Sequence, residues 1–75
     1  MTNLRNKMLE AMYKHADGHI AKHKINVEVY LNNPVGVGEH PDLIEAIETE
    51  LEQIAKYEDQ MDILLKYFPM NREVI

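Results

Sequence analysis

The chain has 75 residues, a formal net charge of −5 at pH 7 and no cysteine. This length fits one small domain, and the absence of cysteine excludes disulfide bonds and thiolate zinc sites. One Phe, four Tyr and no Trp do not provide the basic, aromatic-rich surface that binds nucleic acid, and a net acidic chain is repelled by anionic membranes. We therefore expect neither nucleic acid nor a membrane as a partner.

The N-terminal segment carries charges where a secretory signal has its apolar core, and no run of the chain is apolar enough to span a bilayer. The interrupting charges are Arg5, Lys7, Glu10, Lys14 and Asp17. These features favour a soluble, cytoplasmic protein.

The first predicted helix covers residues 3–32, with Thr2 or Asn3 as its N-cap. Its apolar side chains recur mostly at intervals of four and are expected to share one slowly drifting face. They are Leu4, Met8, Met12, Ala16, Ile20, Val27 and Leu31.

Two features weaken this helix. Gly18 lowers helix stability by about 1 kcal/mol relative to Ala, so a kink or break near Asp17 and Gly18 is the main alternative. Residues 25–31 also alternate as a strand would, but their only nearby partner, residues 35–37, is short and contains Gly36. The sequence favours a helix at residues 25–31.

The segment 33–40 is predicted to be a loop because prolines and glycines crowd into it and its flanks. A second helix follows over residues 41–68, with Pro41 at its first position and Pro69 preventing its continuation. Its apolar residues recur as heptads in a predicted seam. The seam consists of Ile44, Ile47, Leu51, Ile54, Met61, Leu65 and Phe68, with Glu58 as its one polar member and Leu43, Tyr57 and Leu64 as flanking positions.

Two long helices and a short loop predict an all-α antiparallel hairpin, a single domain over residues 1–75 with a tail at 69–75. Two helices alone cannot cover each other's apolar stripes, and small domains bury little surface. The hairpin is therefore expected to form a homodimer as a four-helix bundle, since twofold symmetry is the simplest closed arrangement.

Three histidines, His15, His19 and His23, stand one helical turn apart on one face of the first helix. Antiparallel pairing about the loop places His15 opposite Glu58. We predict that His15 hydrogen-bonds Glu58 at a half-buried seam and helps to fix its register, while His19 and His23 flank the stripe with their polar edges in water. The alternative is a metal site for zinc, nickel or copper formed by His15, His19 and Glu58.

Catalysis is not indicated. The chain has neither Cys nor Ser, and Thr2 and Thr49 have no base nearby in the sequence. We expect a non-enzymatic protein without a cofactor. Residues 39–62 hold nine acidic side chains and one lysine, so a basic protein partner is expected, with mimicry of nucleic acid by an acidic inhibitor as a weaker alternative.

The segments 19–24, 26–41 and 44–51 together resemble small uncharacterised proteins of marine T4-like phages and ocean metagenomes. The likeness lies in a loop and its following helix and includes no catalytic motif. It implies a phage-encoded accessory or structural protein in the cytoplasm of a host cell, and it provides no site residues.

Overall fold

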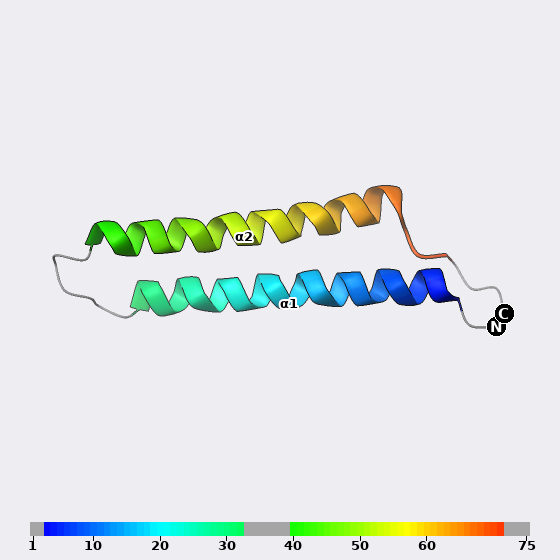
Figure 1. Ribbon diagram of the computed structural model, residues 1–75, viewed down its shortest axis with the longest axis horizontal. Coiled ribbons are helices and arrows are strands. Elements are labelled where there is room, and N and C mark those ends of the chain that lie inside the picture. The colour runs from blue at the N-terminus through cyan, green and yellow to red at the C-terminus, as the bar shows by residue number, and fades with distance from the viewer. Residues whose placement is uncertain (1–2, 33–39, 72–75) are drawn as a thin grey trace.

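The computed structural model is a hairpin of two long antiparallel helices (Figure 1). It describes residues 3–32 and 40–71. Helix α1 spans Leu4–Asn32 and helix α2 spans His40–Tyr67. These described ranges contain no strand, so the all-α fold class is confirmed and residues 25–31 are helical. The predicted loop lies outside the described residues, except for its last residue, His40.

The open end of the hairpin is closed by the residues that follow α2. Asn3 caps α1, because its Oδ1 accepts a hydrogen bond from the Asn6 backbone N–H at 3.1 Å. The Asn6 side chain in turn donates to the Asn71 carbonyl at 2.9 Å and accepts from the Asn71 N–H at 2.8 Å. Arg5 donates to the Pro69 carbonyl at 3.0 Å. The segment 69–71 is thus held against the start of α1, while Val74 and Ile75 lie outside the described residues.

The helices meet along a seam in which contact positions alternate by three and four residues, the spacing that keeps a stripe on one side of a long helix. The least exposed positions of α1 at this spacing are Leu9, Tyr13, Ala16, Ile20, His23, Val27 and Tyr30. Those of α2 are Leu43, Ile47, Glu50, Ile54, Tyr57, Met61 and Leu64. Among the described residues only Leu9, Ala16 and His23 are buried, and the other seam positions are partly exposed.

The predicted face of α1 was partly wrong. Ala16, Ile20 and Val27 do face α2, but Leu4, Met8, Met12 and Leu31 are exposed. Each step of four residues rotates about 40° around an α-helix. Residues spaced four apart therefore rotate out of the seam within a few turns. The residues that stay in the seam are those whose spacing alternates between three and four.

The predicted seam of α2 was also partly wrong. Ile47, Ile54 and Met61 lie between the helices, but the flanking positions Leu43, Tyr57 and Leu64 complete the contact with α1. The other predicted seam positions point outward. We call Ile44, Leu51, Glu58 and Leu65, which follow one another at seven-residue intervals, the outer stripe; all four are exposed, as is Phe68.

None of the described helices is both long and apolar enough to cross a membrane.

Helix α1 continues through Gly18 without the expected break. Its φ is not positive, and a Cβ built there meets no atom within 4 Å. Gly18→Ala should therefore stabilise the protein by about 0.5–1 kcal/mol, because alanine loses less backbone entropy in a helix. Ala11→Gly, at an exposed position of the same helix, is the matched control and should destabilise by a similar amount. Thermal unfolding followed by circular dichroism measures both, and a destabilised Gly18→Ala variant would contradict the argument.

Candidate functional site

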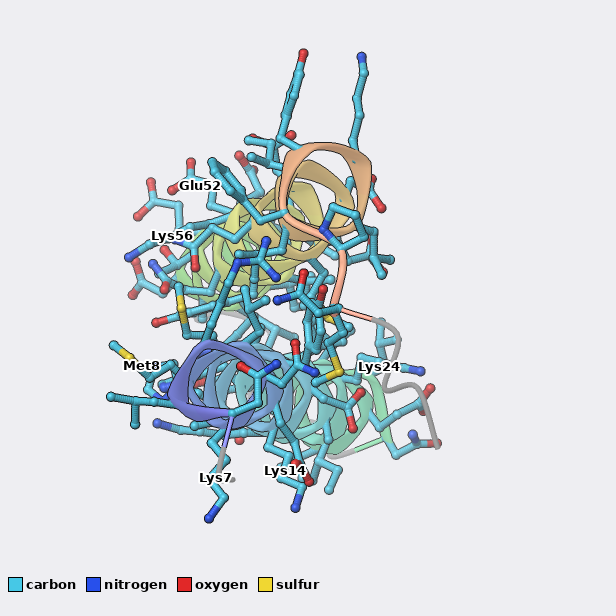
Figure 2. The ribbon with its side chains drawn as sticks, turned by 90° about the vertical axis from the view of Figure 1, so that its right-hand side faces the viewer. Lys7, Met8, Lys14, Lys24, Glu52 and Lys56 are labelled. Carbon is cyan, nitrogen blue, oxygen red and sulfur yellow. The ribbon has the colours of Figure 1, made fainter. Side chains whose placement is uncertain are left out.

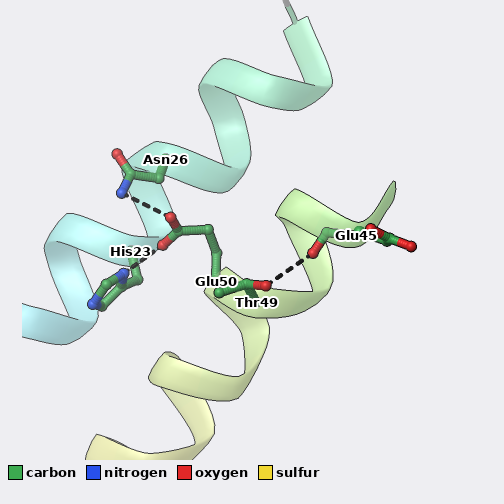
Figure 3. Close-up of polar contacts among 5 residues, drawn as sticks. All are labelled: His23, Asn26, Glu45, Thr49 and Glu50. Carbon is green, nitrogen blue, oxygen red and sulfur yellow. Dashed lines mark hydrogen bonds and ion pairs between the residues drawn. The ribbon is translucent and has the colours of Figure 1, made fainter. Parts of the chain in front are cut away.

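The most buried polar contact between the helices joins His23 of α1 to Glu50 of α2. The His23 Nδ1 atom pairs with a carboxylate oxygen of Glu50, and Asn26 Nδ2 donates to the other oxygen at 3.2 Å (Figure 3). Both side chains lie in the seam, with 11% of the His23 side-chain surface and 15% of that of Glu50 exposed. The predicted polar seam contact thus exists, but between His23 and Glu50 rather than His15 and Glu58.

Glu50 is held in its ionised form by these contacts. The hydrogen bond from His23 is the largest cause that lowers the pKa of Glu50 below its ordinary value, burial opposes it, and the hydrogen bond from Asn26 adds to it. The Glu50 carboxylate accepts hydrogen bonds from two side chains of α1, and it can reach both of them from only one position along that helix. The contact therefore favours a single register of α2 against α1.

A row of aromatic rings runs along one flank of this seam. His19 stacks on Tyr57 with ring centroids 4.3 Å apart and planes 10° from parallel. His15 meets His19 edge-on at 4.5 Å, and His23 lies on the other side of His19 at 5.9 Å. The three histidines do share one face of α1, as their spacing indicated; His15 and His19 meet Tyr57 of α2, and His23 meets Glu50.

Protonation of the His19 ring is disfavoured in this row. Its Nδ1 atom is buried and has no hydrogen-bond partner among the described residues. Burial lowers the pKa of His19 below its ordinary value, and the neighbouring positive or protonatable groups lower it further. Those groups are His15, Lys22 and His23 from α1 and Lys56 from α2.

The structure does not bring His15, His19 and Glu58 together. His15 and His19 line one flank of the hairpin with Lys14 and Lys22, whereas Glu58 is exposed on the other flank beside Asp17. The predicted hydrogen bond between His15 and Glu58 is therefore wrong, because rotation of α2 places Tyr57 opposite His15. Among residues 3–32 and 40–71, no three His, Asp or Glu side chains gather so that they could hold a metal ion.

The prediction that His23 flanks the stripe in water is also wrong, since its ring is buried. The sequence contained a signal that His23 lies in the seam. His23 fills the gap in the apolar row of α1, and Glu50 stands at the seven-residue spacing that links Leu43, Tyr57 and Leu64. A polar residue at corresponding seam positions of both helices marks a buried polar pair.

The flank that carries the outer stripe contains two shallow grooves. The first groove lies nearer the inter-helix connection and is lined by Lys24, Val27 and Glu28 of α1 with Leu51 and Ile54 of α2 among others. The second groove lies nearer the chain termini. It is lined by Asp17, Ile20, Glu58, Met61, Asp62 and Leu65.

These grooves extend the outer stripe onto α1; the first groove is mainly apolar, whereas the second also carries the carboxylates of Asp17, Glu58 and Asp62. Three large side chains of the stripe are half exposed or more: Ile44 at 57%, Leu51 at 50% and Leu65 at 59%. In the view along the hairpin, Lys24 projects on this flank, whereas Met8, Glu52 and Lys56 project on the other (Figure 2). Lys7 and Lys14 point away from α2.

No family model matches the sequence, and no curated protein or solved structure matches it either. The resemblance to phage proteins therefore stays a prediction.

The two lowered pKa values make stability dependent on pH. A group whose pKa is lower in the folded state favours folding when deprotonated, so stability is complete above its unfolded pKa and falls below it. For His19 the loss begins as the pH drops below about 6.5, and for Glu50 it follows at lower pH. Urea unfolding at pH 8, 7, 6 and 5 should show a falling midpoint. His19→Phe, which keeps an aromatic ring against Tyr57, should flatten the first part of this fall; an unchanged slope would contradict the assignment.

The pair of His23 and Glu50 should behave as a coupled unit. His23→Leu and Glu50→Leu should each destabilise the protein, since each leaves a buried polar partner unsatisfied. The double variant should be less destabilised than the sum of the two single variants, because two leucines suit an apolar seam. Unfolding midpoints of the four proteins measure this coupling, and strict additivity would show that the contact contributes nothing.

Proposed function

We propose that this protein is a non-enzymatic helical hairpin that works by self-association, two copies pairing through the outer stripe into a four-helix bundle. The bundle would serve as a structural or interaction module, and its acidic helix α2 would present a surface to a basic protein partner. On the resemblance stated above, we place it in the cytoplasm of a phage-infected cell as an accessory protein.

The amount of exposed surface carries this proposal. A compact monomeric protein of this mass, 8.8 kDa, exposes about 4,800 Å², whereas the hairpin exposes 6149 Å². The excess is larger than the roughly 800 Å² that each partner buries in a standard stable interface. The hairpin is also a rod of 61 × 18 × 14 Å, a shape that offers one long side to a second copy.

The position of the exposed surface supports pairing through α2. Ile44, Leu51 and Leu65 repeat at heptad spacing beside Ile54 and Met61, which already line the seam with α1. A helix with two adjoining apolar stripes is typical of a bundle in which it contacts two neighbours. The second neighbour of α2 is then a helix of another copy.

The two alternative functions stay hypotheses. Metal binding by His15, His19 and Glu58 would need Glu58 on the flank that the histidines occupy. Nucleic-acid mimicry by residues 39–62 rests on their charge alone, and no contact in the described residues favours it.

Leu51→Asp tests the proposed function. Sedimentation equilibrium at micromolar concentration should give the wild type about twice the 8.8 kDa chain mass. Leu51→Asp removes two buried leucines from a twofold interface and places two carboxylates there, so the dimer dissociation constant should rise at least about 100-fold.

Val29→Asp is the matched control, because Val29 is also half exposed but lies on α1 away from the outer stripe. It should leave the dimer intact. A wild-type chain that sediments as a folded monomer at 100-fold higher concentration would overturn the proposed function.

A further inference from the structure

We propose that the two copies pair antiparallel across the outer stripe, about a twofold axis perpendicular to α2, and that Glu58 of each copy forms an ion pair with Lys24 of the other. This inference rests on the proposed self-association. It adds the relative orientation of the two copies and the ion pair that makes this orientation specific.

Glu58 is the residue that requires an explanation. It stands between Leu51 and Leu65 as the one charged member of the outer stripe, so a copy that covers the stripe also covers Glu58. Its groove already contains Asp17 and Asp62, which supply no counter-charge. A carboxylate taken out of water without a partner is strongly unfavourable. The second copy must therefore bring a cation to Glu58.

Lys24 is the cation that the same flank offers. It lines the first groove beside Leu51, seven residues beyond Asp17 on the same side of α1. Among the described residues, neither Lys24 nor Glu58 forms an ion pair within its own chain. Glu28 shares the groove with Lys24, but its carboxylate accepts a hydrogen bond from Asn32 Nδ2 at 3.0 Å. Each copy thus carries an unused cation and an unused anion on one flank.

The distribution of charge selects the orientation. The second groove carries three acidic residues, Asp17, Glu58 and Asp62, and the first carries one of each sign, Lys24 and Glu28. With a twofold axis parallel to the hairpin, each groove would lie against the same groove of the second copy. The three carboxylates of one second groove would then face the three carboxylates of the other. A perpendicular axis lays the acidic groove on the groove that contains Lys24. Like charges brought together in an interface are costly, so the antiparallel arrangement is favoured.

The spacing of the stripe fits the antiparallel arrangement. An axis near the middle of α2 (His40–Tyr67) pairs Ile44 of one copy with Leu65 of the other, and Leu51 with Glu58. All four members of the outer stripe then have a partner within the stripe. Because Lys24 lies beside Leu51 in its own copy, it is placed next to Glu58 of the second copy.

Charge reversal tests the ion pair. Glu58→Lys and Lys24→Glu should each raise the dimer dissociation constant at least about tenfold, since the pair occurs twice in a twofold dimer. The double reversal should restore it to within about threefold of the wild type. Glu52→Lys and Lys56→Glu, on the opposite flank (Figure 2), are matched controls and should change it little. In a parallel dimer Glu58→Lys would instead tighten association by relieving repulsion, which would overturn the inference.

Cysteine cross-linking tests the orientation independently, because the natural chain has no cysteine. In an antiparallel dimer, chains with Ile44→Cys should form a disulfide only when mixed with chains carrying Leu65→Cys. Alone, the two introduced thiols would stand about 30 Å apart, 21 residues along α2 at 1.5 Å each.

The outcomes separate the two proposals. A wild-type monomer would refute the proposed function. A wild-type dimer in which Ile44→Cys chains cross-link with one another would leave the function standing and overturn the antiparallel pairing.

Discussion

Two helices that lie side by side can each cover only one side of the other, and this geometric limit governs the whole molecule. Of the described residues, the seam between α1 and α2 buries only Leu9, Ala16 and His23. Side chains such as Leu51 and Leu65 remain at the surface. Hydrophobic burial is the main favourable term in folding, so a hairpin of this shape still has apolar surface whose burial would stabilise it. Association is the direct way to bury that surface.

Within the seam, the contact of His23 and Glu50 is what distinguishes the observed register from its neighbours. Apolar heptads are nearly periodic, so a slip of seven residues would still pack one apolar side chain on another. The same slip would place His23 opposite Leu43 or Tyr57 and remove Glu50 from its two donors. The loss of a buried polar partner is more costly than the exchange of one apolar neighbour for another. A seam of mostly aliphatic side chains therefore gains its specificity from one polar pair.

The fold could be predicted from the sequence because its strongest signals are local. Helix-breaking prolines and glycines near residues 33–40, with long periodic segments on both sides, predict two helices. These helices begin and end within one residue of the predicted bounds. The side of α2 that faces α1 could not be predicted in the same way. Ile47, Ile54 and Met61 belong equally to the two adjoining stripes, one completed by Leu43 and Leu64 and the other by the outer stripe. Each stripe contains one glutamate, Glu50 or Glu58, so hydrophobicity favours the outer stripe only because the inner one has Tyr57 where the outer one has an aliphatic side chain.

The choice between these stripes depends on the partner helix, which the pattern of α2 does not contain. α1 has few large apolar residues in its seam and a histidine in the middle of it, so it is complementary to the stripe that holds a carboxylate at Glu50 and a flat ring at Tyr57. The more apolar stripe is left outside, with Glu58 as its only charge. Each stripe of α2 thus contains one glutamate, and the first of them meets a basic side chain of the facing helix. By the same physical requirement, a helix that covered the outer stripe would have to present a cation at the place of Glu58, and Lys24 stands on the flank that a second copy would bring there.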